Sequence, residues 1–129
     1  MPGKHALLSA SASKRWMNCP PSARMCENRE DTTSDFAAEG SEAHALVESL
    51  LKKALGRKTS DPTSGFQFYS EEMQECAEGY VAYIMEQVTA AKQRCADPLV
   101  LIEQRLDFTR YVQEGFGTGD CVILADGTL

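Results

Sequence analysis

The hydrophobic pattern changes its period once, at Asp97-Pro98, and this change constrains the fold more than any other feature of the chain. Before it, apolar residues recur at spacings of three, four and seven, which is typical of amphipathic helices. After it, residues 99–108 and 117–124 are rich in β-branched and apolar residues and predict strands. We therefore expect an α+β fold, with N-terminal helices over residues 1–96 followed by an antiparallel β-meander over residues 97–129.

Two long helices are predicted before the change of period. The first covers residues 35–55, with Thr33 or Ser34 as its N-cap and Gly56 as its C-terminal glycine. The second covers residues 71–94 and is capped by Ser70. Each carries one apolar stripe, which predicts one buried face. The stripes are Phe36, Ala43, Val47, Leu50, Leu51 and Ala54 on the first, and Met73, Ala77, Tyr80, Ile84, Val88 and Ala91 on the second.

A shorter helix is predicted nearer the N-terminus. Ser11 or Ser13 is expected to cap it. Cys19-Pro20-Pro21 is expected to end it after Asn18, because a residue before proline is pushed out of the helical region. Cys19 therefore stands at a forced helix end.

The five cysteines include no CxxC pair, which argues against both a disulfide framework and a self-contained zinc site. In a reducing compartment we expect thiols. Cys76 and Cys121 lie in apolar segments, so we expect them to pack as small hydrophobic residues.

Length and charge bound the class of protein. A chain of 129 residues forms one domain at most, over residues 1–129. Its net charge of −6 argues against a protein that coats nucleic acid by bulk electrostatics. Apolar runs such as residues 99–102 are too short to span a membrane, and the N-terminus lacks the apolar core of a signal peptide. We expect a cytoplasmic protein.

A basic cluster lies near the end of the first long helix and consists of Lys52, Lys53, Arg57 and Lys58. Two interpretations stay open. The cluster suits a solvated helix end, where cations complement the helix dipole. It also suits an edge that contacts the phosphates of a DNA backbone.

The first candidate site is at residues 39–44, where Gly40 precedes His44 by four residues, or one helical turn. A glycine inside a helix costs about 1 kcal/mol relative to alanine, so a compensating gain is expected. The missing side chain would leave space beside the imidazole for another backbone or a bound group. A structural histidine is the alternative, and it is the commoner role of a single helix histidine.

The second candidate site is the glycine-rich segment 115–120, where Gly117 precedes Asp120 by three residues. Asp120 is expected to open a strand that is buried on at least one face, where a carboxylate must be paired, hydrogen-bonded or bound to metal. An aspartate that caps a turn is the alternative. An imidazole and a carboxylate together form part of a ligand set for a divalent metal in a phosphodiester-cleaving site.

Three segments carry a resemblance to a known family. They are HALLSASASKRWMNCPPS, DTTSDFAAEGSEAHALVE and IEQRLDFTRYVQEGFGTGDCVILADGTL. From residue 5 to residue 129 the chain resembles the N-terminal half of a phage- and prophage-associated family in the RecB-like branch of the PD-(D/E)XK nuclease superfamily. The resemblance implies a metal-dependent DNA nuclease in the cytoplasm of a bacterial host. It also implies DNA and phage recombination proteins as partners.

The resemblance further implies roles for single residues. His44 matches the histidine of the GxxxH motif, a metal ligand. Asp120 matches the aspartate of the GxxD motif, the first catalytic carboxylate, which binds Mg²⁺ or Mn²⁺. The motif glycines are Gly40 and Gly117. Cys19 matches the first of four ligands of a 4Fe–4S cluster, the other three lying in a C-terminal cysteine cluster. Glu103 lies on the first strand, where relatives often carry a glutamate, and no role is assigned to it.

The chain departs from the family pattern after Asp120. The carboxylate-x-lysine motif of the next strand is absent before Leu129, and Asp126-Gly127 instead has a hairpin-turn signature that would start a third strand at Thr128. We therefore expect an incomplete nuclease domain that does not cleave DNA by itself. The alternative is a non-catalytic helical interaction domain of a phage protein. An exposed sheet edge at residues 117–124 also predicts self-association.

Overall fold

The computed structural model of the chain describes residues 6–30, 32 and 34–129. The chain divides into two compact units. One contains Met1–Asp31 and Glu103–Asp120, and the other contains Thr32–Ile102 and Cys121–Leu129.

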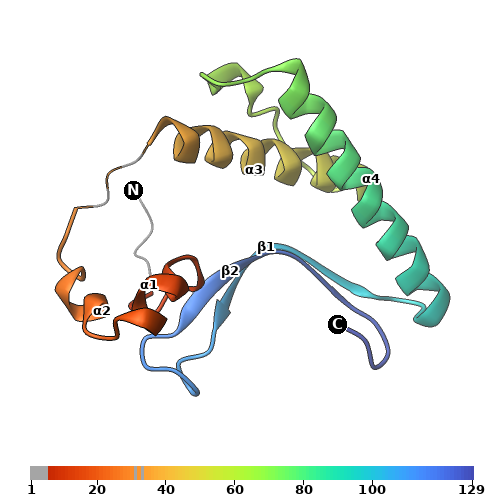
Figure 1. Cartoon of the computed structure of the whole chain (residues 1–129). Helices are drawn as coiled ribbons and strands as arrows, with labels where there is room; N and C mark the ends of the chain where they lie inside the picture. The colour runs from red at the N-terminus through yellow and green to blue at the C-terminus, as the bar shows by residue number, and fades with distance from the viewer. Residues whose placement is uncertain (1–5, 31, 33) are drawn as a thin grey trace. The chain divides into compact units, whose positions relative to one another are not determined.

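The fold is α+β, as predicted, with helices followed by a two-stranded antiparallel sheet (Figure 1). Its elements are η1 (Ala10–Ala12), α1 (Ser13–Asn18), α2 (Ser22–Met25), α3 (Asp35–Ala54), η2 (Thr63–Gly65), α4 (Glu71–Arg94), β1 (Leu99–Asp107) and β2 (Phe116–Leu124). Within the described residues the sheet is a hairpin, not the expected meander. Ala125 and Thr128 form only an isolated antiparallel bridge around the predicted turn. No helix in the described part of the chain is long and apolar enough to cross a membrane.

The two long helices begin and end where their sequence signals predict. The Ser34 hydroxyl accepts a hydrogen bond from the Ala37 N–H at the start of α3, and Ser70 does the same for Met73 at the start of α4. Thr33, the other predicted cap, lies outside the described residues. After α3, Gly56 has a φ of +73°, a left-handed conformation that glycine adopts without steric cost.

Helices α3 and α4 form the core of the larger unit (Figure 1). Leu46 packs with Met73 and Ala77 near the start of α4, whereas Leu51 packs with Ile84 and Val88 further along it. The contacts follow the same order along both helices. The helices therefore run in the same general direction, and the connection between them must return to the beginning of α4.

This returning connection is held against α3. Phe66 and Phe68 pack against the cluster around Leu46. The two carboxylate oxygens of Glu42 accept hydrogen bonds from the backbone N–H groups of Gln67 and Phe68, each at 2.8 Å. Hydrogen bonds to an ionised acceptor are stronger than neutral ones. Glu42, in the middle of the segment that carries His44, therefore has a structural role.

The sheet contributes to the same core through the parts of β1 and β2 that belong to this unit. Val100 is buried with Leu51, and Ile102, Cys121 and Ile123 pack against that cluster. The prediction that Cys121 packs as a small hydrophobic residue is confirmed. All five cysteines are described, and none of them forms a disulfide.

Four stripe and cysteine predictions are wrong, since Phe36, Ala54, Cys76 and Tyr80 are all exposed. Phe36 is 85% exposed, and Leu46, outside the predicted stripe, is buried instead. Phe36 lies in the first turn of α3, before the contact with α4 begins. Cys76 is exposed because it lies outside the buried face of α4 that Met73, Ala77, Ile84 and Val88 define. Tyr80 has the spacing of that face but belongs to neither core cluster, and it is 40% exposed.

The smaller unit begins with the short helices. The predicted serine cap at Ser11 or Ser13 is wrong, because α1 continues directly from the 3₁₀ turn and its N-cap is Ala12. The indole N–H of Trp16 donates to the carbonyl oxygen of Ser9 at 2.9 Å and ties α1 to the preceding segment.

The Cys19-Pro20-Pro21 segment ends α1, as predicted. It also begins α2, which the sequence pattern did not indicate. Pro21 is the N-cap of α2, and the fixed φ of proline suits the first turn of a helix, where its missing N–H is not needed. A proline pair therefore marks the boundary between two helices here.

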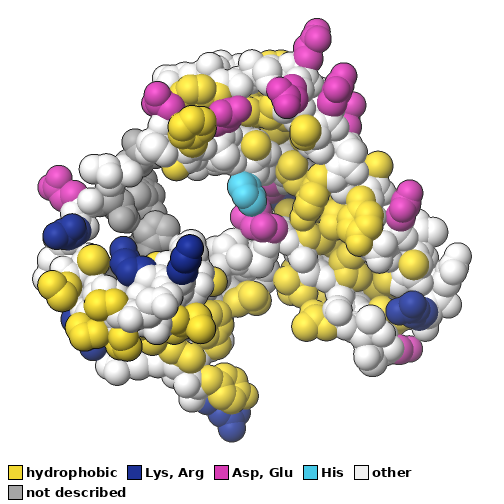
Figure 2. Space-filling view, in the orientation of Figure 1, with side chains coloured by type: hydrophobic (Ala, Val, Ile, Leu, Met, Phe, Trp, Pro, Cys, Tyr) yellow, Lys and Arg dark blue, Asp and Glu magenta, His cyan; other side chains and the backbone are white. Residues whose placement is uncertain are grey.

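Charge is unevenly divided between the units. The smaller unit contains seven Lys or Arg and seven Asp or Glu residues, whereas the larger contains six and twelve. Figure 2 shows acidic side chains spread over α3 and α4, and Lys and Arg side chains gathered over the α1–α2 segment. The net charge of −6 therefore belongs to the larger unit.

Candidate metal centre

Two carboxylates face each other across the hairpin. Phe108 N–H donates to the Gly115 carbonyl oxygen at 3.0 Å and closes the loop between β1 and β2. Glu103 lies five residues before Phe108, and Asp120 five residues after Gly115, so the two occupy opposed positions. A carboxylate oxygen of each lies within 4.8 Å of one of the other.

Glu103 has an unusual backbone conformation for the middle of a strand. Its φ is +48°, in the left-handed region that a side chain makes unfavourable. Such residues cost on the order of 1–3 kcal/mol and occur often at functional sites. Glu114, in the hairpin loop, has a similar φ of +51°. It is therefore a glutamate of the same hairpin with which Glu103 can be compared.

The environment of Asp120 differs from the prediction. Asp120 lies at the centre of β2, not at its start, and it is exposed, whereas Glu103 is half-buried. The expected burial is wrong because the described sheet has two strands, and no third strand covers this position. Carboxylate oxygens are ligands that Mg²⁺ and Mn²⁺ prefer. Like charges opposed across a sheet cost about 0.2–1 kcal/mol, which a bound cation would offset.

His44 belongs to the other unit, on α3, and is exposed. Gly40 lies one turn before it, and a Cβ atom built on Gly40 would meet no atom within 4 Å. Within the described residues, no group therefore approaches the Gly40 position closely enough to explain a glycine there or to compensate for its cost to the helix.

The glycine that the hairpin requires is Gly115. A Cβ atom there would lie 2.7 Å from the Phe108 ring and 2.8 Å from the Val112 carbonyl oxygen, distances that real Cβ atoms do not show. At Gly117, the glycine of the motif, a Cβ would make only an ordinary contact with Phe108 at 4.0 Å. Loop closure therefore requires a glycine at position 115. At position 117 the structure has room for a larger side chain, so steric crowding does not explain the glycine there.

The basic cluster at the end of α3 is partly engaged within the protein. Lys52 forms an ion pair with Glu48 one turn earlier, and Arg57 donates to the Val100 carbonyl oxygen at 2.8 Å. Lys53 lies close enough to Asp61 to contribute to the lowered pKa of that carboxyl. These contacts favour the solvated helix end over the phosphate-binding edge.

Cys19 is exposed, at the end of α1. A 4Fe–4S cluster needs four ligands, usually cysteines. Within the described residues, Cys19 belongs to no group of three or more His, Cys, Asp or Glu side chains that could hold an ion. The other three ligands are expected in a C-terminal cysteine cluster, so the 4Fe–4S cluster stays a prediction.

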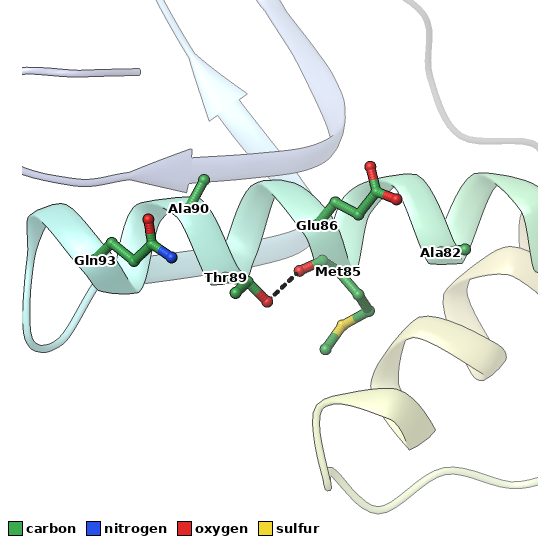
Figure 3. Close-up of a pocket in the computed structure, with 6 residues that line it drawn as sticks. All are labelled: Ala82, Met85, Glu86, Thr89, Ala90 and Gln93. Atoms are coloured by element: carbon green, nitrogen blue, oxygen red, sulfur yellow. Dashed lines mark hydrogen bonds between the residues drawn. The ribbon is translucent and has the colours of Figure 1, made fainter.

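A shallow groove on α4 lies apart from these groups (Figure 3). Six residues of this one helix line it, and the Thr89 hydroxyl donates to the Met85 carbonyl oxygen at 2.9 Å. Glu86 is the one titratable side chain among them, so the groove lacks the paired groups that acid–base or metal chemistry needs.

Glu103 is the site residue to which the sequence analysis assigned no role. The signal that could have identified it was the register of the hairpin, because the loop closure at Phe108 and Gly115 determines which residue faces Asp120. That closure depends on a tight loop of unusual geometry, with Glu114 in the left-handed region, which periodicity does not reveal.

Comparison with known proteins gives one family. A family model described as "Protein of unknown function (DUF2800)" matches residues 5–129. No solved structure matches the chain. The description of the family contains no activity, so the nuclease function and the phage origin stay predictions.

Proposed function

Because the chain belongs to the DUF2800 family, whose description names no activity, we propose its function from the opposed carboxylates. Glu103 and Asp120 bind a divalent cation, Mg²⁺ or Mn²⁺. The chain supplies this metal-binding part to a RecB-like nuclease that hydrolyses DNA, in a phage-associated protein of the bacterial cytoplasm.

The observation that carries the proposal is the close approach of two acidic side chains, within 4.8 Å, on neighbouring strands. The left-handed backbone of Glu103 also supports the proposal, because strained backbone conformations occur often at functional sites. We also propose His44 as a ligand, because it matches the histidine of the GxxxH motif, and an imidazole nitrogen together with carboxylate oxygens is a donor set that Mn²⁺ accepts.

A bound metal would supply an activated water and would stabilise the charge that develops on the phosphate. The chain's own residues hold that metal in place. Asp120 and Glu103 would offset its charge from the two strands of the hairpin, and His44 would supply an imidazole nitrogen. No carboxylate-x-lysine follows Asp120 before Leu129, so we expect residues 1–129 to bind metal without cleaving DNA.

Titration with Mn²⁺, followed by calorimetry and by the electron paramagnetic resonance of the ion, tests the proposal. We expect one site in the wild-type chain. Asp120→Asn and Glu103→Gln should each weaken Mn²⁺ binding by at least about tenfold, the smallest loss expected from disturbing a metal site. His44→Gln should remove the nitrogen coupling from the spectrum.

Glu114→Gln is the matched control, because Glu114 is an acidic residue of the same hairpin with nearly the same backbone conformation. It should leave Mn²⁺ affinity unchanged. The proposal fails if the wild-type chain does not bind Mn²⁺, or if Asp120→Asn binds it as tightly as Glu114→Gln does.

A non-catalytic helical interaction domain is the second candidate. It is favoured by Phe36, a large hydrophobic side chain that is 85% exposed on α3, and by the open groove on α4. This function needs no metal. Absence of Mn²⁺ binding, together with a loss of partner binding in Phe36→Ala, would support it.

A further inference from the structure

We propose that the loop between β1 and β2 is a stacking site for a base of single-stranded DNA. This inference deepens the proposed function, and it rests on it, because it names the form of DNA that the chain would receive. The loop covers residues 108–115, in the unit that also contains Glu103 and Asp120.

Tyr111 presents its ring to solvent from a hydrogen-bonded turn. Its side chain is 80% exposed, although burial of an aromatic ring would be favourable. Its backbone N–H and that of Val112 both donate to the Phe108 carbonyl oxygen, at 2.9 and 3.0 Å. Gly115 N–H donates back to Val112 at 2.9 Å. These hydrogen bonds fix the backbone of the loop, which presents the Tyr111 ring to water.

Two arginines accompany the aromatic rings of this hairpin. The Arg110 guanidinium carbon lies 5.9 Å from the centroid of the Tyr111 ring, and that of Arg105 lies 4.5 Å from the centroid of Phe116. Figure 2 shows basic and hydrophobic side chains together at the end of the loop. A ring that stacks on a base beside a cation that contacts phosphate is the combination used by proteins that bind single strands.

Charge favours this unit as the surface that meets DNA. It has equal numbers of basic and acidic residues, whereas the other unit has an excess of six acidic ones. Two of its acidic residues are Glu103 and Asp120, whose charge a divalent cation would neutralise. With metal bound, the unit would be net positive.

The spacing along the hairpin fits one continuous strand of DNA. Five residues of extended chain separate Phe108 from Glu103, which is about 17 Å at the rise of a β-strand. Single-strand binding sites typically cover about 4–16 nucleotides, so one strand can reach both the loop and the carboxylates. Bases inside a duplex are already stacked, which makes the exposed Tyr111 ring selective for single strands.

The experiment measures fluorescence anisotropy of a labelled oligo-dT, about 12 nucleotides long, with EDTA present. EDTA removes any divalent metal, so DNA binding that depends on metal at Glu103 and Asp120 is abolished and the assay reports binding at the loop alone. Tyr111→Ala should weaken binding about 5- to 150-fold, the loss of one base–aromatic stack, whereas Tyr111→Phe should retain it. Arg110→Ala should reduce the slope of log K against log salt by about 0.7.

Tyr83→Ala is the matched control, since Tyr83 is also an exposed tyrosine, 59% accessible, on α4. It should leave the affinity unchanged. The inference is overturned if Tyr111→Ala binds oligo-dT as Tyr83→Ala does, or if a duplex of the same length binds as tightly as the single strand. Loss of Mn²⁺ binding with oligo-dT binding intact would instead refute the proposed function alone.

Discussion

Replacement of Gly40 by alanine distinguishes two hypotheses about this residue. Either α3 contains the glycine without functional need, or the glycine leaves space for a bound group. Gly40 lies inside α3, one turn before His44, and a Cβ atom there would meet no protein atom within 4 Å. Alanine therefore fits without steric cost. Because glycine is less favourable than alanine by about 0.8–1.0 kcal/mol inside a helix, Gly40→Ala should stabilise the protein by about 1 kcal/mol.

Gly79 offers a matched control on α4. It is also inside a long helix, and a Cβ atom there would also meet nothing within 4 Å. Gly79→Ala should give the same gain in the free energy of unfolding. For a domain of this size, 1 kcal/mol corresponds to a rise in Tm of about 4 °C. Urea unfolding followed by circular dichroism measures both gains, and unchanged m-values would show that the denatured state is unaffected.

The two variants should differ in DNA binding with Mn²⁺ present. If the space beside His44 receives a bound phosphate or sugar, the methyl group of Gly40→Ala will weaken binding of oligo-dT, whereas Gly79→Ala will not. A loss of stability in Gly40→Ala would show that this space is filled in the folded protein. Equal DNA affinity of the two variants would refute the reasoning that the glycine serves a ligand.

Two further predictions concern pH and assembly. The hydroxyl and the backbone N–H of Thr63 donate to Asp61 at 2.7 and 2.9 Å and hold the pKa of that carboxyl below its ordinary value. The unfolded chain therefore takes up this proton at higher pH, so the stabilisation is present above the unfolded pKa and is lost as the pH falls through the folded pKa. Thr63→Val should raise the pKa of Asp61 in an NMR titration, and an unchanged pKa would contradict the assignment. Each strand of the hairpin has one edge without a strand neighbour in the described residues, so we expect concentration-dependent self-association, which a constant sedimentation coefficient would exclude.

The limits of α3 and α4 and the α+β class could be predicted from the sequence because their causes are local. Ser34 and Ser70 satisfy N–H groups three residues away, and Gly56 ends α3 through its own backbone conformation. Hairpin strands of nearly the predicted length follow from β-branched runs bounded by glycine and proline. These signals need no knowledge of what packs against them.

The tertiary structure alone decided which side chains meet. Phe36 has the right spacing for a buried stripe, yet α4 does not reach it, and Leu46 is buried because α4 does. Glu103 faces Asp120 because the loop closes between Phe108 and Gly115, with a close approach that only glycine allows. The two long helices, the two strands and the candidate residues His44 and Asp120 could be predicted from the sequence, whereas α2 could not. Pairing across a hairpin depends on register, a non-local property, and so the second carboxylate emerged only from the fold.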